Sequence, residues 1–218
     1  MIGLGTTLSL RAGHVSVERA DAGLDAAVQA IRHVEQHMSL FNPESSLCRL
    51  NRDGVLLQPD PDLIKILTLA RQISERSQGS FDVTVQPLWN AWQNAKQLNR
   101  LPTANELKLA RSKTGWQHLE VTSERIRLLQ SGMALTLNGI AQGYASDIAR
   151  DALRLHSIEH ALIDTGEWST LGQSDDSRPW LLGVENPRFA DTVLAKIVSD
   201  GRAVATSSDA HCSFSSDL

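Results

Sequence analysis

Helical patterns fill the first half of the chain and short β-like runs the second, and this order limits the fold more than any other feature. Apolar residues recur at steps of three and four across residues 18–37 and again across 63–73, which predicts two amphipathic helices. Thr103 and Glu106 have the spacing of a capping box for a shorter helix over residues 103–113. Because helices and strands do not alternate regularly, we expect an α+β fold. No internal repeat or low-complexity linker is present, so we expect a single domain over residues 1–218, or else an intimate pair.

Other segments carry weaker local signals. Ser45 or Ser46 suits the cap of a short helical turn, and the second long helix should stop at Gly79. Residues 81–92 should be extended at first and helical after Pro87, and apolar spacing predicts a helix over 144–155. The β-like runs cover residues 6–12, 117–121, 125–129, 134–138, 161–164, 180–184, 193–198 and 203–206.

Composition excludes several classes of protein. The chain has 218 residues, of which 41% are hydrophobic, with a formal net charge of −4, so it is neither a disordered chain nor a strongly basic nucleic-acid binder. No apolar run approaches the roughly 20 residues that span a bilayer. Cys48 and Cys212 are far apart and lack neighbours at ligand spacing, which excludes a zinc ribbon. Residues 1–7 lack the basic and apolar regions of an export signal.

A glycine-containing turn between a β-like run and a helix is the strongest local signal. Residues 135–147 read LTLNGIAQGYASD, with Gly139 and Gly143 placed where a helix begins. A helix start of this kind favours an anion, and glycine lets a phosphate approach closely. An ordinary connection with glycines that serve packing fits the same letters. The dinucleotide and P-loop glycine motifs are absent, so the sequence supports neither fold.

Two further turns are candidates for binding. In the first, Ser80 and Asp82 are suited to hydrogen-bond a base or sugar, and Phe81 to form an apolar wall. An Asx-turn at Asp82 with a core Phe81 is the alternative, and the residues alone favour it. In the second, Asp164 and Glu167 follow a β-like run and could hold a hard cation or act as a base, although such residues more often cap a turn.

The histidines and serines do not form a recognisable catalytic motif. His33 and His37 are four residues apart on the first long helix, but no glutamate follows His33, so the metalloprotease pattern fails and a solvated helix face is expected. The nucleophile-elbow motif is absent as well. The sequence therefore assigns no catalytic residue.

Taken in order, several segments resemble the ApbE family, the FAD:protein FMN transferases. The resemblance extends over nearly the whole chain and implies an α+β, T-fold-like domain with FAD held in a cleft and magnesium on its pyrophosphate. It also implies that the C-terminal part of the family domain lies beyond Leu218. The matching segments are residues 4–6, 38–41, 46–51, 79–84, 135–147, 163–166 and 205–207.

The resemblance implies a role for each matching position. Leu4 and Phe41 stand where the family usually has a methionine and a tyrosine at the flavin site. Ser80, Phe81 and Asp82 match the stretch that holds the adenosine side of FAD. Thr136 and Gln142 match further FAD contacts, although both positions are usually charged in the family, and Gly139 matches the residue whose carbonyl helps to bind magnesium. Asp164 and Glu167 replace a usual asparagine and glycine.

The implied activity is the transfer of FMN from FAD to a serine or threonine of an acceptor flavoprotein, with release of AMP. The acceptor would belong to a membrane redox complex on the periplasmic side or in the cell envelope, and the sequence leaves the cytoplasm open. Two alternatives remain. One is a related FAD pyrophosphatase, and the other, suggested by the charge that Thr136 and Gln142 remove, is a non-catalytic flavin-binding or assembly protein. No nucleic-acid partner is expected.

Overall fold

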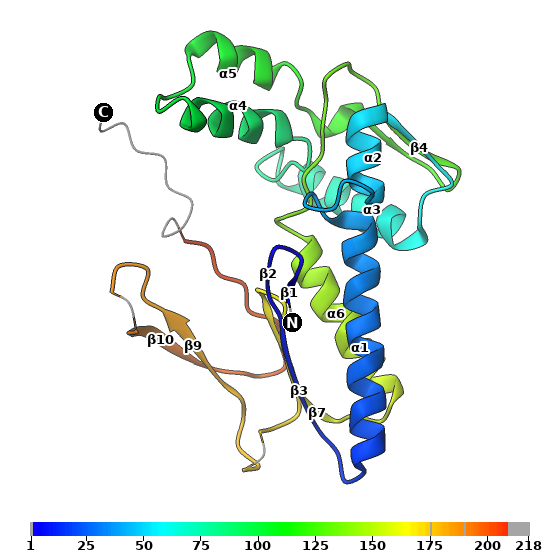
Figure 1. Cartoon of the computed structure of the whole chain (residues 1–218), viewed down its shortest axis with the longest axis vertical. Coiled ribbons are helices and arrows are strands. Elements are labelled where there is room, and N and C mark those ends of the chain that lie inside the picture. The colour runs from blue at the N-terminus through cyan, green and yellow to red at the C-terminus, as the bar shows by residue number, and fades with distance from the viewer. Residues whose placement is uncertain (1, 175, 190, 209–218) are drawn as a thin grey trace. The chain divides into compact units, whose positions relative to one another are not determined.

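In the computed structural model, the residues described are 2–174, 176–189 and 191–208. They form two compact units (Figure 1). One contains the described residues up to Val34 and those from Gln142 onward, and the other is Glu35–Ala141. Helix α1 (Val17–Met38) runs without a break through the first boundary, and α6 (Ala141–Leu155) begins at the second. The expectation of one domain stays a prediction.

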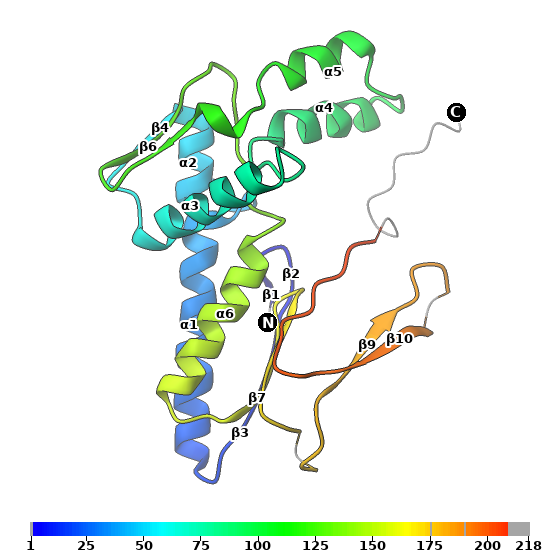
Figure 2. The same ribbon diagram turned by 180° about the vertical axis from the view of Figure 1, so that it is seen from behind.

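The unit Glu35–Ala141 is mostly helical. Helices α2 (Ser46–Asp53) and α3 (Pro61–Arg76) bury leucines and isoleucines, and α4 (Gln86–Gln97) lies beside α5 (Ala104–Arg111), as Figure 2 shows. A 3-10 turn (Trp116–His118) leads into a small antiparallel sheet of order β4-β6-β5, made of β4 (Val55–Leu57), β5 (Leu119–Val121) and β6 (Arg125–Leu128).

Local sequence explains the helix ends in this unit. The Ser45 hydroxyl accepts a hydrogen bond from the Cys48 N–H at 3.0 Å, and Gly54, with φ of 73°, ends α2. Thr103 and Glu106 form the predicted capping box of α5. Helix α3 ends at Arg76, and Gly79 follows with φ of 82°, which confirms the predicted stop.

The other unit combines helices with antiparallel strands. Strands β1 (Ile2–Gly3) and β2 (Thr6–Thr7) form a hairpin, and β3 (Ser9–Gly13), β7 (His160–Asp164) and β8 (Trp168–Leu171) form a sheet of order β3-β7-β8. Strands β9 (Leu181–Glu185) and β10 (Val193–Val198) pair separately. Gly23 brings α1 close to the end of α6, because a Cβ there would lie 3.0 Å from Ile158.

The predicted α+β class and the main helices are confirmed. Several predicted strands are wrong: residues 81–85 form a turn, 117–118 belong to the 3-10 turn, 134–137 pair with no strand, and 138 lies in a turn. The run 6–12 is split at Leu8, and Val204 makes only an isolated bridge to Trp168. Strands β4 and β8 were not predicted. Cys212 lies outside the described residues.

Candidate functional site

Asp82 is held in a turn by the chain around it. Its Oδ1 accepts hydrogen bonds from the Thr84 N–H at 2.8 Å and from the Thr84 hydroxyl at 2.7 Å, and its Oδ2 accepts one from the Trp116 N–H at 3.1 Å. The Thr84 hydroxyl oxygen in turn accepts from the Gly115 N–H at 2.7 Å. The Asx-turn at Asp82 is therefore confirmed, whereas the core position expected for Phe81 in the same alternative is not. A carboxylate engaged in this way shapes the corner that Ser80, Phe81 and Asp82 form.

The turn that precedes α6 lies beside this corner. A Cβ on Gly139 would sit 3.6 Å from Cε2 of the Phe81 ring, which is ordinary van der Waals contact, and the Thr136 N–H donates to the Val83 carbonyl at 2.8 Å. These two segments are therefore neighbours, whereas their role in binding a flavin stays a prediction. Phe81 is half-buried and not a core residue.

Asn51 fixes the segment that carries Thr136. Its Oδ1 accepts from the Leu135 N–H at 2.7 Å, and its Nδ2 donates to the Leu135 carbonyl at 2.9 Å. Leu135 and Leu137 are buried, so the alternation along this segment leaves Thr136 half-buried between them. Sequence reasoning did not assign Asn51 to the site, because nothing local links two residues 84 positions apart.

The first two N–H groups at the start of α6 are engaged within the chain, and the residues just before them are exposed. The N–H groups of Ile140 and Ala141 both donate to the Leu137 carbonyl, at 2.9 and 2.7 Å, and Asn138 and Gly139 are exposed. The positive end of the helix dipole therefore lies beside an exposed glycine backbone. Thr136 and Gln142 add no charge there.

In the other unit, Gln142 packs against the turn between β7 and β8. A Cβ on Gly166 would lie 2.7 Å from Nε2 of Gln142 and 3.2 Å from Cγ2 of Thr6, so only glycine leaves this side chain its place. The Thr165 hydroxyl donates to the Gln142 carbonyl at 3.0 Å, and Ser146 and Thr165 share a buried hydrogen bond of 2.6 Å. These contacts join the first turn of α6 to the β7–β8 turn.

The acidic pair in the β7–β8 turn has divided roles. Asp164 Oδ1 accepts from the Gly166 N–H at 3.0 Å, so this carboxylate shapes the turn. Burial raises the pKa of Glu167, the charge of Asp164 raises it further, and a hydrogen bond from the Thr206 backbone lowers it. Within the described residues, Oε2 of Glu167 is buried without a hydrogen-bond partner.

The remaining predicted contacts differ in exposure. Leu4 is buried in the β1–β2 turn, where Leu4 and Gly5 have φ of 53° and 78°, as a two-residue hairpin turn with two positive φ angles requires. Phe41 is 70% exposed. Leu4 and Gln142 belong to one compact unit, whereas Phe41, Ser80, Phe81, Asp82, Thr136 and Gly139 belong to the other.

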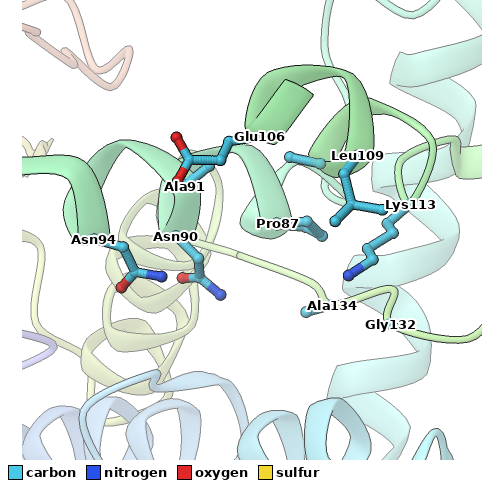
Figure 3. A pocket seen from close by; sticks show the side chains of 10 residues that line it. Pro87, Asn90, Ala91, Asn94, Glu106, Leu109, Lys113, Gly132 and Ala134 are labelled. Carbon is cyan, nitrogen blue, oxygen red and sulfur yellow. The ribbon is translucent and has the colours of Figure 1, made fainter. Parts of the chain in front are cut away.

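A cavity of about 280 Å³ lies between α4, α5 and the segment Gly132–Ala134. Figure 3 shows the Lys113 ammonium and the Asn90 amide reaching toward the same open space, with Pro87 and Ala134 beside it. The Lys113 side chain lies along Gly132, where an added Cβ would be 2.9 Å from its Cε. Sequence reasoning missed this cavity, whose lining includes both the Lys113 ammonium and the Glu106 carboxylate.

The residues described at the Gly139 turn do not complete a magnesium site. Magnesium binds about six oxygen ligands and normally includes a carboxylate among them. The turn offers the Gly139 carbonyl, while both oxygens of Asp82 accept hydrogen bonds from the chain. Among the described residues, the one group of three potential metal ligands from His, Cys, Asp and Glu is His33, His37 and Asp60.

The sequence model of the ApbE family matches residues 4–217. Two proteins named FAD:protein FMN transferase are each 28% identical: one from Vibrio cholerae, over 86% of this chain and 58% of its own length, and one from Klebsiella pneumoniae, over 90% and 60%. The chain thus spans about three fifths of these curated relatives.

Two solved structures are also similar. The ApbE protein from Thermotoga maritima is 25% identical and superposes with a TM-score of 0.84, over 96% of this chain and 69% of its own. The Pseudomonas stutzeri flavinyl transferase ApbE in its apo form is 27% identical, with a TM-score of 0.73 over 87% and 62%.

Proposed function

The chain belongs to the ApbE family, and from that membership we propose that it acts as an FAD:protein FMN transferase. The relatives named above carry this activity in their names. Since the chain spans about three fifths of their length, the activity, substrates and partners of the whole protein are proposals for this chain.

In the proposed reaction, the hydroxyl oxygen of a serine or threonine on the acceptor attacks the FMN-side phosphorus of FAD. A bond forms between that phosphorus and the acceptor oxygen, the bond from the phosphorus to the bridging oxygen breaks, and AMP leaves with the bridging oxygen. The hydroxyl proton passes to a base. We assign that base to none of the described residues.

The observation that carries the proposal is the proximity of the Phe81 ring to Gly139, where an added Cβ would lie 3.6 Å from Cε2 of the ring. It sets an aromatic ring beside the turn that opens α6, where the helix dipole favours a phosphate group. The Asp82 carboxylate holds this corner in shape by accepting a hydrogen bond from the Trp116 N–H. Thr136 lies half-buried on the neighbouring segment. We propose that the FAD contacts are Leu4, Phe41, Ser80, Phe81, Asp82, Thr136 and Gln142.

Magnesium, the acceptor and the compartment rest on the family resemblance. The Gly139 carbonyl would be one magnesium ligand, and no step above depends on the metal. The acceptor would be a flavoprotein of a membrane redox complex, in the periplasm or cell envelope. Among the described residues, no helix is long and apolar enough to cross a bilayer.

The test is to incubate the purified chain with FAD, Mg²⁺ and a flavoprotein acceptor domain, and to measure covalent flavin on the acceptor together with released AMP. FAD affinity is measured in parallel for Phe81→Leu. Because loss of base stacking costs about 1–3 kcal/mol, this variant should bind FAD roughly tenfold more weakly. Phe189→Leu, at an exposed phenylalanine of the β9–β10 connection, is the matched control.

Each outcome discriminates between the proposed functions. Covalent flavin on the acceptor with AMP released in equal amount supports the transferase. Free FMN and AMP with an unmodified acceptor would identify an FAD pyrophosphatase, and FAD binding without cleavage a non-catalytic flavin-binding protein. The neutral side chains of Thr136 and Gln142 favour the last alternative over the pyrophosphatase. Equal FAD affinity of the two phenylalanine variants would contradict the proposed pocket.

A further inference from the structure

A second cluster of potential ligands lies outside the proposed flavin contacts. His33, His37 and Asp60 each offer one ligand atom, and these atoms all lie within 4.8 Å of one another. The two histidines are one turn apart on the continuous helix α1, so that helix sets their spacing. The expected solvated helix face is therefore wrong, since both imidazoles are half-buried and an aspartate from another segment joins them.

Hydrogen bonds to neighbouring groups orient the side chains of both His37 and Asp60. Nδ1 of His37 is 2.8 Å from the Ser46 hydroxyl, which leaves Nε2 directed at Asp60. Oδ1 of Asp60 accepts from the Asp62 N–H at 2.9 Å as the N-cap of α3, which leaves Oδ2 directed at His37. Histidine ligands of zinc are typically held in this way, through the nitrogen that does not bind the metal.

The distance across this pair suits a metal better than a direct hydrogen bond. Nε2 of His37 and Oδ2 of Asp60 are 3.6 Å apart, which is too long for a hydrogen bond. In a tetrahedral zinc site with bonds of about 2.0–2.1 Å, two ligand atoms are about 3.3 Å apart. The pair therefore needs to close by only a few tenths of an ångström.

We infer that His33, His37 and Asp60 form a binding site for a zinc ion, with water as the fourth ligand. Two imidazoles and one carboxylate are a donor set that zinc prefers and magnesium does not. The side chains of His37 and Asp60 are 18% and 15% exposed, which leaves a path for the ion. The Arg49 guanidinium lies 3.3 Å from the Ser46 hydroxyl oxygen and donates a hydrogen bond to it.

A bound zinc ion would tie the last two turns of α1 to the first turn of α3. Asp60 is the N-cap of α3 and Ser46 is the first residue of α2, so the ion and its outer contacts would reach three helices. We therefore expect zinc to raise the thermal stability of the chain, because a ligand that binds the folded state stabilises it.

The test measures zinc binding to the metal-free full chain by isothermal titration calorimetry, with Co²⁺ absorption as a probe of tetrahedral geometry. All proteins tested carry His211→Gln and Cys212→Ser. These substitutions remove a histidine and a thiol that are consecutive in the sequence and could bind zinc by themselves. The variants are His33→Gln and Asp60→Asn, the second of which keeps an N-cap acceptor for α3. His156→Gln, outside the cluster, is the matched control.

We expect one zinc ion per chain, tetrahedral Co²⁺ bands and no competition from Mg²⁺. Each ligand variant should weaken zinc binding by at least about 100-fold, because outer contacts alone are worth roughly 10–100-fold. His156→Gln should bind as the unaltered protein does. Absence of stoichiometric zinc binding, or zinc affinity that His33→Gln leaves unchanged, would overturn the proposal. His33→Gln alone decides the result if Asp60→Asn does not fold.

Discussion

The side-chain amide of Asn51 satisfies both backbone hydrogen-bonding groups of Leu135, at 2.7 and 2.9 Å. It does for this residue what a neighbouring strand would do in a sheet. The next residue, Thr136, donates its N–H to Val83, so the segment that leads into α6 is held beside the Asp82 corner. A single helix side chain thus positions one part of the proposed flavin site.

Replacing Asn51 with leucine should destabilise the protein strongly. The substitution leaves an N–H and a carbonyl of a fully buried residue unsatisfied, and each costs about 1–3 kcal/mol. We expect the free energy of unfolding, measured by urea denaturation, to fall by about 2–5 kcal/mol. Asn94→Leu, at an exposed position of α4, should change it by less than about 0.5 kcal/mol. Similar values for the two variants would show that Leu135 does not depend on the amide.

Gly166→Ala should destabilise the β7–β8 turn and displace Gln142. The residue has φ of 93°, and an added Cβ would lie 2.7 Å from Nε2 of Gln142. We expect a loss of about 1–2 kcal/mol from the backbone conformation. In a double-mutant cycle, Gln142→Ala should relieve only the steric part of the cost. Strict additivity of the two substitutions in the unfolding free energy would argue against the contact.

Glu167 should make stability depend on pH. Burial raises the pKa of its carboxyl in the folded state above the ordinary value of 4.5. The folded state therefore holds the proton more tightly than the unfolded state, and stability falls as pH rises from about 4.5 through the folded pKa. Glu167→Gln should flatten this decline and be the more stable protein at neutral pH.

Urea denaturation of both proteins across about pH 4–8 checks this prediction. The two unfolding free energies should converge at the acidic end of the range and separate as the pH rises. Parallel curves would show that Glu167 ionises alike in the folded and unfolded states.

Gly143 and Gly54 form a matched pair for the effect of backbone conformation. Nothing lies within 4 Å of a Cβ added at either position, but only Gly54 has a positive φ, of 73°. Gly143→Ala, in the first turn of α6, should stabilise the protein by about 0.5–1 kcal/mol. Gly54→Ala should destabilise it by about 1–2 kcal/mol. Thermal unfolding distinguishes the two signs, and a shift of the same sign in both would contradict the reasoning.

Local patterns predicted the elements that local interactions stabilise. Helix α1 follows from apolar spacing, and α5 from the capping box of Thr103 and Glu106. The run 134–138 has the alternation of a strand, and its buried positions are correct, but the partner of Leu135 is a side chain 84 residues away. The periodicity of a sequence indicates which side chains are buried. It does not indicate which group pairs with the backbone N–H and carbonyl of each residue. Strand β4 has only three residues and was not predicted, although the equally short β5 lies within the predicted run 117–121.

Some residues of the candidate site were predictable from the sequence and others were not. The roles of the Ser80–Asp82 corner and of Gly139 were assigned from the family resemblance and not from periodicity, and the structure makes Phe81 and Gly139 neighbours. The positions of Trp116 and Asn51 were not predictable, because both act through contacts between distant segments. The same holds for Asp60, which no spacing rule connects with His33 and His37.

Gly139→Leu tests the proposed flavin pocket without disturbing the fold. The first added carbon meets Phe81 at 3.6 Å, an ordinary contact, and Gly139 is exposed and lacks a positive φ, so thermal stability without ligand should change little. The remaining side-chain atoms would occupy the approach to the start of α6, where we place the pyrophosphate. FAD affinity, measured by titration of flavin fluorescence, should therefore fall about tenfold or more, a loss of roughly 1.4 kcal/mol. FAD affinity equal to that of the unaltered protein would place the ligand elsewhere, whereas a large loss of stability would mean that the turn needs glycine for folding.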